Sequence, residues 1–312
     1  MTDYESLHTK YRPQKFDDVV GQDRVVESLC RVLSHSTSHA FLFSGPSGVG
    51  KTTLARLAAK RIGCLRKDIR EIDAATFSGV DPMREVTRGL QYRPLGKGRL
   101  KAIIVDECAS LSKQAWQSLL KNIEEPPAHV YWFFCTTELS RVPRTIKTRC
   151  ASYILIDVGL RDLEKLVARI AKKESMVLEP SVKSLIVGEA QGSPRQALVN
   201  LALCDGVKNR KEASEILRSA SESDPVIQLC KYLIRRGTWE QGLSILEKLS
   251  DYNPESVRIM VVNYMAKVIT STKSEKSVVK LLGILDAFSE PFNQSDRQAP
   301  LLLALGRVLY GE

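Results

Sequence analysis

The chain has 312 residues, of which 43% are hydrophobic and 26% are charged, an ordinary balance for a soluble globular protein. This length exceeds what one hydrophobic core usually serves, so we expect two or three domains, and no apolar run is long enough to span a bilayer. The net charge of +10 favours a polyanionic partner, nucleic acid first, but charge carries little weight until the cations are shown to share one surface.

The N-terminus and the cysteines exclude further classes. Residues 1–5 are polar and acidic, which does not fit a secretory signal and predicts a cytoplasmic protein. The seven cysteines lie far apart and form no C-x-x-C pair, so the sequence suggests neither a disulfide framework nor a zinc site. Free thiols, mostly buried, are expected instead.

Residues 1–157 alternate apolar strand-like runs with helical patterns. We expect strands at 40–44, 69–72, 101–105, 130–136 and 151–156. This alternation predicts an α/β domain with a mainly parallel sheet and helices on both faces. The nearly continuous apolar runs at 103–105 and 131–134 are typical of strands that are covered on both sides.

Residues 45–53 form a complete phosphate-binding loop of the pattern G-x-x-x-x-G-K-[ST], between an expected strand and an expected helix. The glycines let backbone N–H groups surround a phosphate, and the helix N-terminus adds partial positive charge. Lys51 would reach the outer phosphates, and the Thr52 hydroxyl would ligate Mg²⁺. A glycine-rich turn that binds nothing is the alternative, which the lysine, the threonine and the flanking elements disfavour. The loop residues predicted to contact nucleotide are Gly45, Ser47, Gly48, Val49, Gly50, Lys51, Thr52 and Thr53.

A second acidic element follows the apolar run at 103–105. Asp106 would hold Mg²⁺, and Glu107 would orient and deprotonate the attacking water, so the predicted outcome is hydrolysis. An acidic strand end that merely faces solvent is a common alternative, but the phosphate-binding loop upstream favours the functional interpretation.

Strand signals stop near residue 159, and the rest of the chain is predicted to be helical. Leu163, Leu166, Val167 and Ile170 keep helical spacing, a second helix begins near residue 180, and a third begins where Ser193 can cap and Pro194 suits the first turn. We therefore expect a helical domain at 158–208.

Residues 209–312 contain amphipathic helices without a catalytic cluster, which indicates packing or assembly. The positions expected to share helical faces are Val226, Leu229, Cys230 and Leu233, then Val257, Met260, Val261 and Tyr264, then Val278, Leu281, Leu282 and Leu285.

Several short motifs, taken together, resemble those of AAA+ sliding-clamp loader ATPases. The resemblance is to the tau/gamma subunits of bacterial DNA polymerase III and, more loosely, to the small subunits of replication factor C. It covers residues 7 to about 205, whereas the last hundred residues or so match only in being helical and of collar-domain length. The motifs are Lys10-Tyr11-Arg12-Pro13, Val20-Gly21-Gln22, the phosphate-binding loop, Glu71-Ile72-Asp73-Ala74-Ala75, Asp106-Glu107, the run at 120–127, Thr136-Thr137 and Thr148-Arg149-Cys150.

The resemblance implies roles for residues outside the loop. Thr136 would be the sensor at a strand end, with Thr137 as the next choice, and a polar strand terminus as the alternative. Arg149 would be an arginine finger that acts on the ATP site of the next subunit, unless it is a surface ion-pairing arginine. Arg195 would reach the phosphates from the helical domain of the same chain, unless it points at water. The residues that would line the adenine pocket, rather than form a packed arm, are Tyr11, Arg12, Pro13, Val20, Gly21 and Gln22.

The resemblance also implies the assembly and its ligands. A finger that acts in trans requires a ring or spiral of clamp-loader subunits, expected to be pentameric and either homomeric or heteromeric. Such a motor uses ATP and Mg²⁺ to open a sliding clamp and load it on primer–template DNA, in the cytosol of a bacterium or a phage-infected host, with no membrane partner.

Two departures from the tau/gamma pattern shape this expectation. The four-cysteine zinc module is absent, because residues 62–68 pass almost directly into the next expected strand, so we predict no zinc. We also expect no extension past the third domain. A compact or phage-encoded loader subunit would fit both features.

DNA phosphates are held by cations and by helix N-termini. Ser78 and Arg84 lie at one expected helix start and Lys113 at another, and in clamp loaders these two starts face the central channel. These three residues are the predicted DNA contacts. The denser basic run of Arg93, Lys97, Arg99 and Lys101 is expected to be a solvated loop.

Two other functions remain open at this point. One is an AAA+ DNA remodeller or helicase loader, although these usually lack the Thr-Arg-Cys element. The other is an ATP-binding structural subunit of a replication complex, which the intact Lys51, Thr52, Asp106 and Glu107 argue against.

Overall fold

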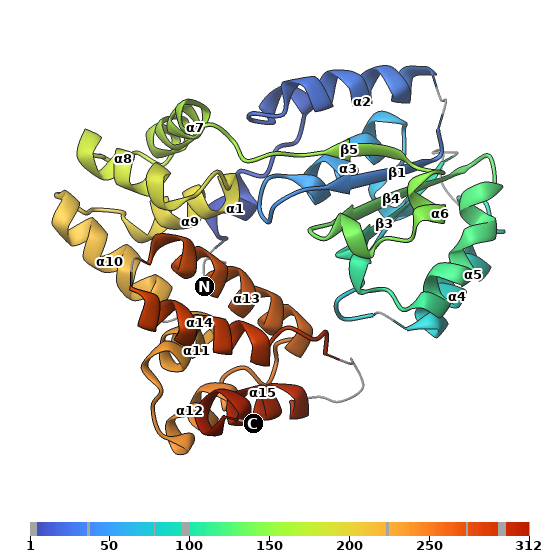
Figure 1. Ribbon diagram of the computed structural model, residues 1–312. Helices are drawn as coiled ribbons and strands as arrows, with labels where there is room; N and C mark the ends of the chain where they lie inside the picture. The colour runs from blue at the N-terminus through green and yellow to red at the C-terminus, as the bar shows by residue number, and fades with distance from the viewer. Residues whose placement is uncertain are drawn as a thin grey trace. The chain divides into compact units, whose positions relative to one another are not determined.

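The computed structural model describes residues 5–35, 38–77, 79–94, 100–222, 225–272, 274–292 and 298–311 (Figure 1). The chain divides into two compact units, residues 1–213 and residues 214–312, and the division falls within helix α10 (Arg210–Glu222). The two units do not separate the expected domains 1–157 and 158–208, because both lie in the first unit. The three-domain division therefore remains a prediction.

The first unit contains a five-stranded parallel sheet in the order β2-β3-β4-β1-β5. This arrangement confirms the predicted α/β class. The strands are β1 (Ala40–Ser44), β2 (Ile69–Asp73), β3 (Lys101–Asp106), β4 (Val130–Thr136) and β5 (Ala151–Ile154). The last strand ends before the predicted residue 156, because the backbone of Ile156 bonds to the side chain of Gln22 instead of a neighbouring strand.

Alternate side chains of the central strands pack into two separate hydrophobic cores, one on each face of the sheet. Phe41, Phe43 and Phe133 pack under α2 (Asp23–His35) and α3 (Lys51–Arg61). The opposite face includes Trp132 and Phe134 and is covered by three helices (Figure 1), namely α4 (Val80–Gly89), α5 (Lys113–Glu124) and α6 (Arg144–Lys147). Because every central strand is buried on both sides, its residues form the continuous apolar runs seen in the sequence.

Three further helices complete the globular part of the first unit, and we call residues 160–203 the lid. They are α7 (Leu160–Lys173), α8 (Pro180–Glu189) and α9 (Pro194–Leu203). The four apolar positions predicted to share a face of α7 are all buried. Ser193 caps α9 as expected, because its hydroxyl accepts a hydrogen bond from the Gln196 N–H at 3.2 Å.

The second unit is helical and has its own apolar core. Its helices are α11 (Pro225–Arg235), α12 (Trp239–Glu247), α13 (Pro254–Ser271), α14 (Glu275–Ala287) and α15 (Ala299–Tyr310). The predicted face of α11 is fully buried, but Met260 of α13 and Leu282 of α14 are 40% and 51% exposed. Met265 and Ile284 occupy the core in those two helices instead.

Two negative findings apply to the described residues. No helix there is long and apolar enough to cross a membrane. No group of three or more His, Cys, Asp or Glu side chains in those same segments could hold a metal ion. The expectation of a chain without zinc stays a prediction.

Candidate nucleotide-binding site

The phosphate-binding loop connects β1 to α3 and depends on glycine at three positions. Gly45, Gly48 and Gly50 have φ values of +145°, +76° and +112°, where side chains are strained. A Cβ atom on Gly45 would lie 2.3 Å from the carbonyl oxygen of Leu155, and one on Gly48 would lie 2.2 Å from Oγ of Ser193. The loop is therefore in direct contact with both the segment that follows β5 and the start of α9.

Lys51 is the first residue of α3, and it is only 5% exposed. Its Nζ atom donates hydrogen bonds to the carbonyl oxygens of Gly45 and Pro46 at 2.9 and 2.8 Å. Burial lowers the pKa of this ammonium group, an effect that the nearby Glu107 carboxylate opposes. The ammonium lies inside the loop, where phosphate oxygens can replace the two carbonyl acceptors.

The Asp106 carboxylate, at the end of β3, contacts Thr52 of the phosphate-binding loop. The Thr52 hydroxyl donates to Oδ2 of Asp106 at 2.7 Å, and the N–H of Glu107 donates to the other carboxylate oxygen at 3.1 Å. Glu107 has a left-handed backbone, with φ of +45° and ψ of +44°. A hydroxyl beside a carboxylate is a ligand set that suits Mg²⁺, and both groups lie at the mouth of the loop.

The two threonines at the end of β4 have different surroundings. Thr136 is fully buried, and its hydroxyl accepts a hydrogen bond from the N–H of Glu138 at 2.9 Å. The hydroxyl of Thr137 donates to Oε2 of Glu107 at 3.0 Å. These contacts favour Thr137, the second choice for the sensor, because its hydroxyl contacts the candidate base while that of Thr136 bonds within the turn, and the sensor assignment stays a prediction.

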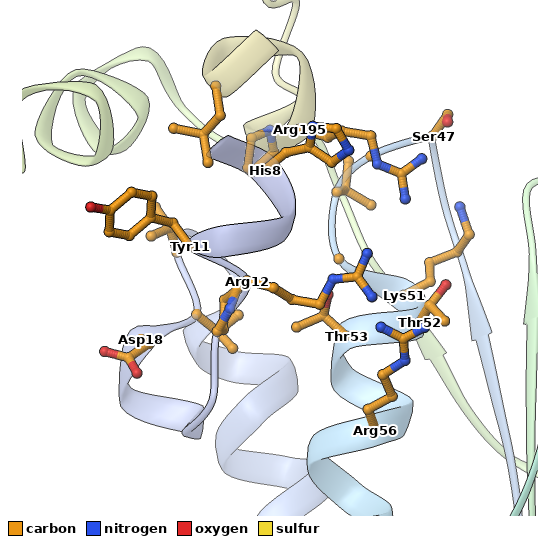
Figure 2. Close-up of a pocket in the computed structure, with 18 of the residues that line it drawn as sticks. His8, Tyr11, Arg12, Asp18, Ser47, Lys51, Thr52, Thr53, Arg56 and Arg195 are labelled. Atoms are coloured by element: carbon orange, nitrogen blue, oxygen red, sulfur yellow. The ribbon is translucent and has the colours of Figure 1, made fainter. Parts of the chain in front are cut away.

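A cavity of about 290 Å³ lies in front of the loop. It is lined by the N-terminal arm (defined here as residues 7–22), by the phosphate-binding loop with the start of α3, by residues at the ends of β2 and β3, and by the lid. Figure 2 shows Arg12 extending from the arm and Arg195 from α9, with Lys51 and Thr52 on the loop side of the same space. The predicted site residues that line the cavity are Tyr11, Arg12, Pro13, Val20, Ser47, Gly48, Val49, Gly50, Lys51, Thr52, Thr53, Asp106, Glu107 and Arg195.

Gly21 and Gln22 were also predicted to line the adenine pocket, but they are absent from its wall. Gln22 is buried and donates from Nε2 to the carbonyl oxygen of Ile156 at 2.7 Å. A Cβ on Gly21, whose φ is +72°, would lie 2.7 Å from the Val158 side chain. These two residues contact the segment that joins β5 to the lid, which fits the packed-arm alternative for them.

Sequence reasoning missed several residues of the cavity wall. Leu166 and Leu198 carry an apolar signal that also fits a helix core, and Arg169 had no signal beyond its position on α7. Arg56 pairs with Glu71 at 2.5 Å beside the loop. The complete set of missed wall residues is His8, Asp18, Val19, Arg56, Glu71, Asp73, Leu166, Arg169, Pro194 and Leu198.

Arg149 lies outside the cavity of its own chain. Its Nη2 atom is 2.6 Å from Oε1 of Glu124, and its Nη1 atom donates to the carbonyl oxygen of Thr145 at 2.8 Å. Both side chains of the ion pair are about two-fifths exposed, at 38% and 42%. Within one chain Arg149 is thus a surface ion-pairing arginine, and any action on nucleotide requires another copy or subunit.

Two of the predicted DNA contacts, Arg84 and Lys113, lie on helices that start at the carboxyl edge of the sheet. Helices α4 and α5 follow the adjacent parallel strands β2 and β3 and pack against each other, so both helices start at that edge. Lys113 begins α5 and is exposed, whereas Arg84 is 3.4 Å from Asp81. Ser78 lies outside the described residues.

Three features together define a P-loop nucleotide-binding protein of the AAA+ fold: a parallel sheet with this strand order, a glycine-rich loop that carries Lys51, and a helical lid. Asp106 and Glu107, at the carboxyl end of β3, complete the site. The RuvB Holliday junction branch migration motor of Thermotoga maritima has a similar structure, with a TM-score of 0.58 and 19% identity over 73% of this chain and 81% of that one. At this identity the likeness shows the fold alone.

Sequence relatives define the family. The family described as "DNA polymerase III, delta subunit" matches residues 66–158. The chain is 32% identical to DNA polymerase III subunit gamma of Buchnera aphidicola subsp. Acyrthosiphon pisum, over 83% of this chain and 78% of that protein. It is also 32% identical to DNA polymerase III subunit tau of Escherichia coli K12, over 90% of this chain but only 45% of that protein. The chain belongs to the DNA polymerase III gamma/tau family, and it spans less than half the length of the E. coli relative.

Proposed function

We propose that this protein is an ATP-hydrolysing subunit of a sliding-clamp loader, which opens a processivity clamp and places it on primer–template DNA during replication. The observation that carries the proposal is the arrangement of Lys51, Thr52, Asp106 and Glu107 around one cavity in a chain of the gamma/tau family. A non-hydrolysing subunit would not need both carboxylates beside that loop.

The residues around the phosphate-binding loop have separate roles in the proposed mechanism. Lys51 exchanges its two carbonyl acceptors for phosphate oxygens when nucleotide enters. Thr52 and Asp106 would hold Mg²⁺, which neutralises charge on the phosphates when it is bound. Glu107 takes the proton of the attacking water. The Thr137 hydroxyl donates a hydrogen bond to the Glu107 carboxylate and thereby orients that carboxylate.

The lid and a neighbouring subunit complete the cycle. Arg195 reaches the nucleotide from the first turn of α9, so the lid responds to the nucleotide of its own chain. Arg149 would leave Glu124 and stabilise the transferred phosphoryl group bound by the next subunit, in a ring or spiral that we propose to be pentameric. Nucleotide then shifts the population of open and closed assemblies, which is how ATP would drive clamp opening.

The surroundings follow from the same proposal. The partners are a sliding clamp, primer–template DNA and other loader subunits, and the compartment is the cytoplasm of a bacterium or of a phage-infected bacterium. Arg84 and Lys113, at two helix starts on one edge of the sheet, are the proposed contacts with DNA phosphates.

The test is ATP turnover by the purified full chain, measured alone, with clamp, with primed DNA and with both. We expect turnover to rise most when both are present, because each stabilises the closed assembly. Turnover that is indifferent to both additions would contradict the loader proposal, and DNA strand unwinding by the protein would favour a remodeller instead.

A further inference from the structure

The N-terminal arm and the lid are joined by a cluster around the carboxylate of Glu174. Oε1 of Glu174 lies 2.6 Å from Nζ of Lys10, and the same oxygen accepts a hydrogen bond from the Tyr11 hydroxyl. The ammonium groups of Lys10 and Lys173 each lie 5.5 Å from the centre of the Tyr11 ring. We call Lys10, Tyr11, Lys173 and Glu174 the clasp.

The position of Glu174 at a helix end argues against an incidental contact with Lys10 and Tyr11. Glu174 caps the C-terminus of α7, where the helix dipole disfavours a carboxylate and favours cations such as Lys172 and Lys173. Its side chain is nevertheless only 19% exposed, because Lys10 and Tyr11 cover it. Hydrogen bonds from Lys10 and Tyr11 hold the pKa of Glu174 below its usual range, so the carboxylate stays ionised at neutral pH.

The other end of the arm is also attached to the lid side of the molecule. Gln22 bonds to the backbone of Ile156, and Gly21 packs on Val158, both in the segment that leads from β5 into α7. Helix α1 (Leu7–Lys10) packs against α9 as well. A movement of the lid therefore carries the arm with it, or else breaks the clasp.

Of the clasp residues, Tyr11 lines the cavity, and in Figure 2 Tyr11 and Lys51 stand on opposite sides of the close-up. The arm and the lid also line the cavity with Pro13, Val20, Leu166 and Leu198, apolar side chains that suit a flat base, whereas the loop suits phosphates.

We propose that Glu174 is a positioning residue, which holds Tyr11 and the arm on the lid so that arm and lid close on the nucleobase as one body. The inference rests on the proposed nucleotide binding and deepens it. Glu174 does not touch the reacting atoms, so its effect should appear in the affinity for the base-bearing ligand rather than in the chemistry of hydrolysis.

The experiment compares two ligands of the full chain by calorimetry, MgATP and magnesium tripolyphosphate, which lacks the base and the ribose. For Glu174→Ala we expect the ATP dissociation constant to rise about tenfold, with that of tripolyphosphate almost unchanged. Glu174→Gln should recover part of the loss, because an amide oxygen still accepts from Tyr11 and Lys10. Glu164→Ala, a carboxylate removal elsewhere on α7, is the matched control and should leave both constants unchanged.

Each outcome bears on one proposal. Equal weakening of ATP and tripolyphosphate by Glu174→Ala, or no weakening of either, overturns the positioning role. If Glu174→Ala does not fold, Tyr11→Phe removes only the hydroxyl that Glu174 accepts, and ATP affinity equal to that of the wild type then overturns the inference. A wild-type chain that binds neither ligand refutes the proposed function itself.

Discussion

The two units of this chain differ first in charge. Residues 214–312 contain twelve Lys and Arg residues and twelve Asp and Glu residues, so the whole net charge of +10 lies in residues 1–213. The candidate nucleotide site and the candidate DNA contacts also lie there. A basic surplus confined to the unit with the phosphate chemistry is far stronger support for polyanionic ligands than the same surplus spread over the chain.

The buried polar groups next to the candidate site differ from the buried carboxylate of the second unit in what they contact. In the first unit, buried Lys51 and Gln22 bond to backbone carbonyls of the loop and of the segment before the lid. In the second unit, buried Glu255 forms a bidentate pair with Arg258, at 2.8 and 2.9 Å, and also accepts from the N–H of Phe292. The first set supports a site for a ligand, whereas the second fastens helices to each other.

The largest expected effect tests whether the first unit is complete by itself. Arg149→Ala should lower ATP turnover by the assembled protein about 10³-fold or more, because an arginine finger stabilises charge on the transferred phosphoryl group. ATP binding by a single chain should not change, since Arg149 lies outside the cavity. The measurement is steady-state turnover together with ATP affinity.

Arg144→Ala is the matched control for that experiment. Arg144 is an exposed arginine at the start of α6, the short helix that ends shortly before Arg149, so its removal tests the loss of a surface cation. Equal turnover by Arg149→Ala and Arg144→Ala would show that Arg149 is only a surface ion-pairing residue. Catalysis would then not require an arginine from a neighbouring subunit.

The next effect concerns chemistry within the first unit. Glu107→Gln should lower turnover about 10²- to 10⁴-fold, because an amide cannot take the proton from water. ATP affinity should stay near that of the wild type, because Lys51 and the loop are untouched. Single-turnover rates and ATP binding check both expectations, and normal turnover would rule out Glu107 as the base.

Sequence patterns located the sheet, the loop and the acidic strand end because each is formed by consecutive residues. A strand and a glycine-rich loop have local causes, such as apolar runs and positions that require positive φ. The choice between Thr136 and Thr137 depends on which hydroxyl faces Glu107 at a strand end, and a shift of one residue reverses it.

The contacts that position the arm beside the site could not be predicted from local sequence patterns. Gln22 bonds to Ile156 across 134 residues, and Tyr11 bonds to Glu174 across 163. No spacing rule connects such positions, because the fold alone brings them together. The cavity wall from the lid was missed for the same reason, since Leu166 and Leu198 read simply as helix-core residues.

A third prediction tests whether the second unit is held together independently of the site. Glu255→Ala should leave Arg258, whose side chain is only 12% exposed, without its carboxylate and lower the free energy of unfolding of that unit by about 3–5 kcal/mol. ATP affinity should be unaffected. Denaturant unfolding and ATP binding of the full chain give both numbers.

Glu275→Ala is the control here, because Glu275 also lies in the first turn of a helix but is exposed. We expect it to cost well under 1 kcal/mol, which is the scale of a surface charge near a helix start. A loss of ATP affinity in Glu255→Ala would show that the two units are energetically coupled and would break the distinction drawn between them.

The smallest effect concerns DNA and the location of the net charge. Lys113→Ala should weaken binding of primed DNA a few-fold at any base sequence and lower the slope of log affinity against log salt by about one, because one phosphate contact is lost. Lys248→Ala removes an exposed lysine from the electroneutral second unit, at the end of α12, and should change neither quantity. Titrations of labelled DNA at several salt concentrations measure both. If Lys248→Ala lowered the slope as much as Lys113→Ala, DNA binding would depend on charge anywhere on the chain. That result would contradict a specific phosphate contact at the start of α5.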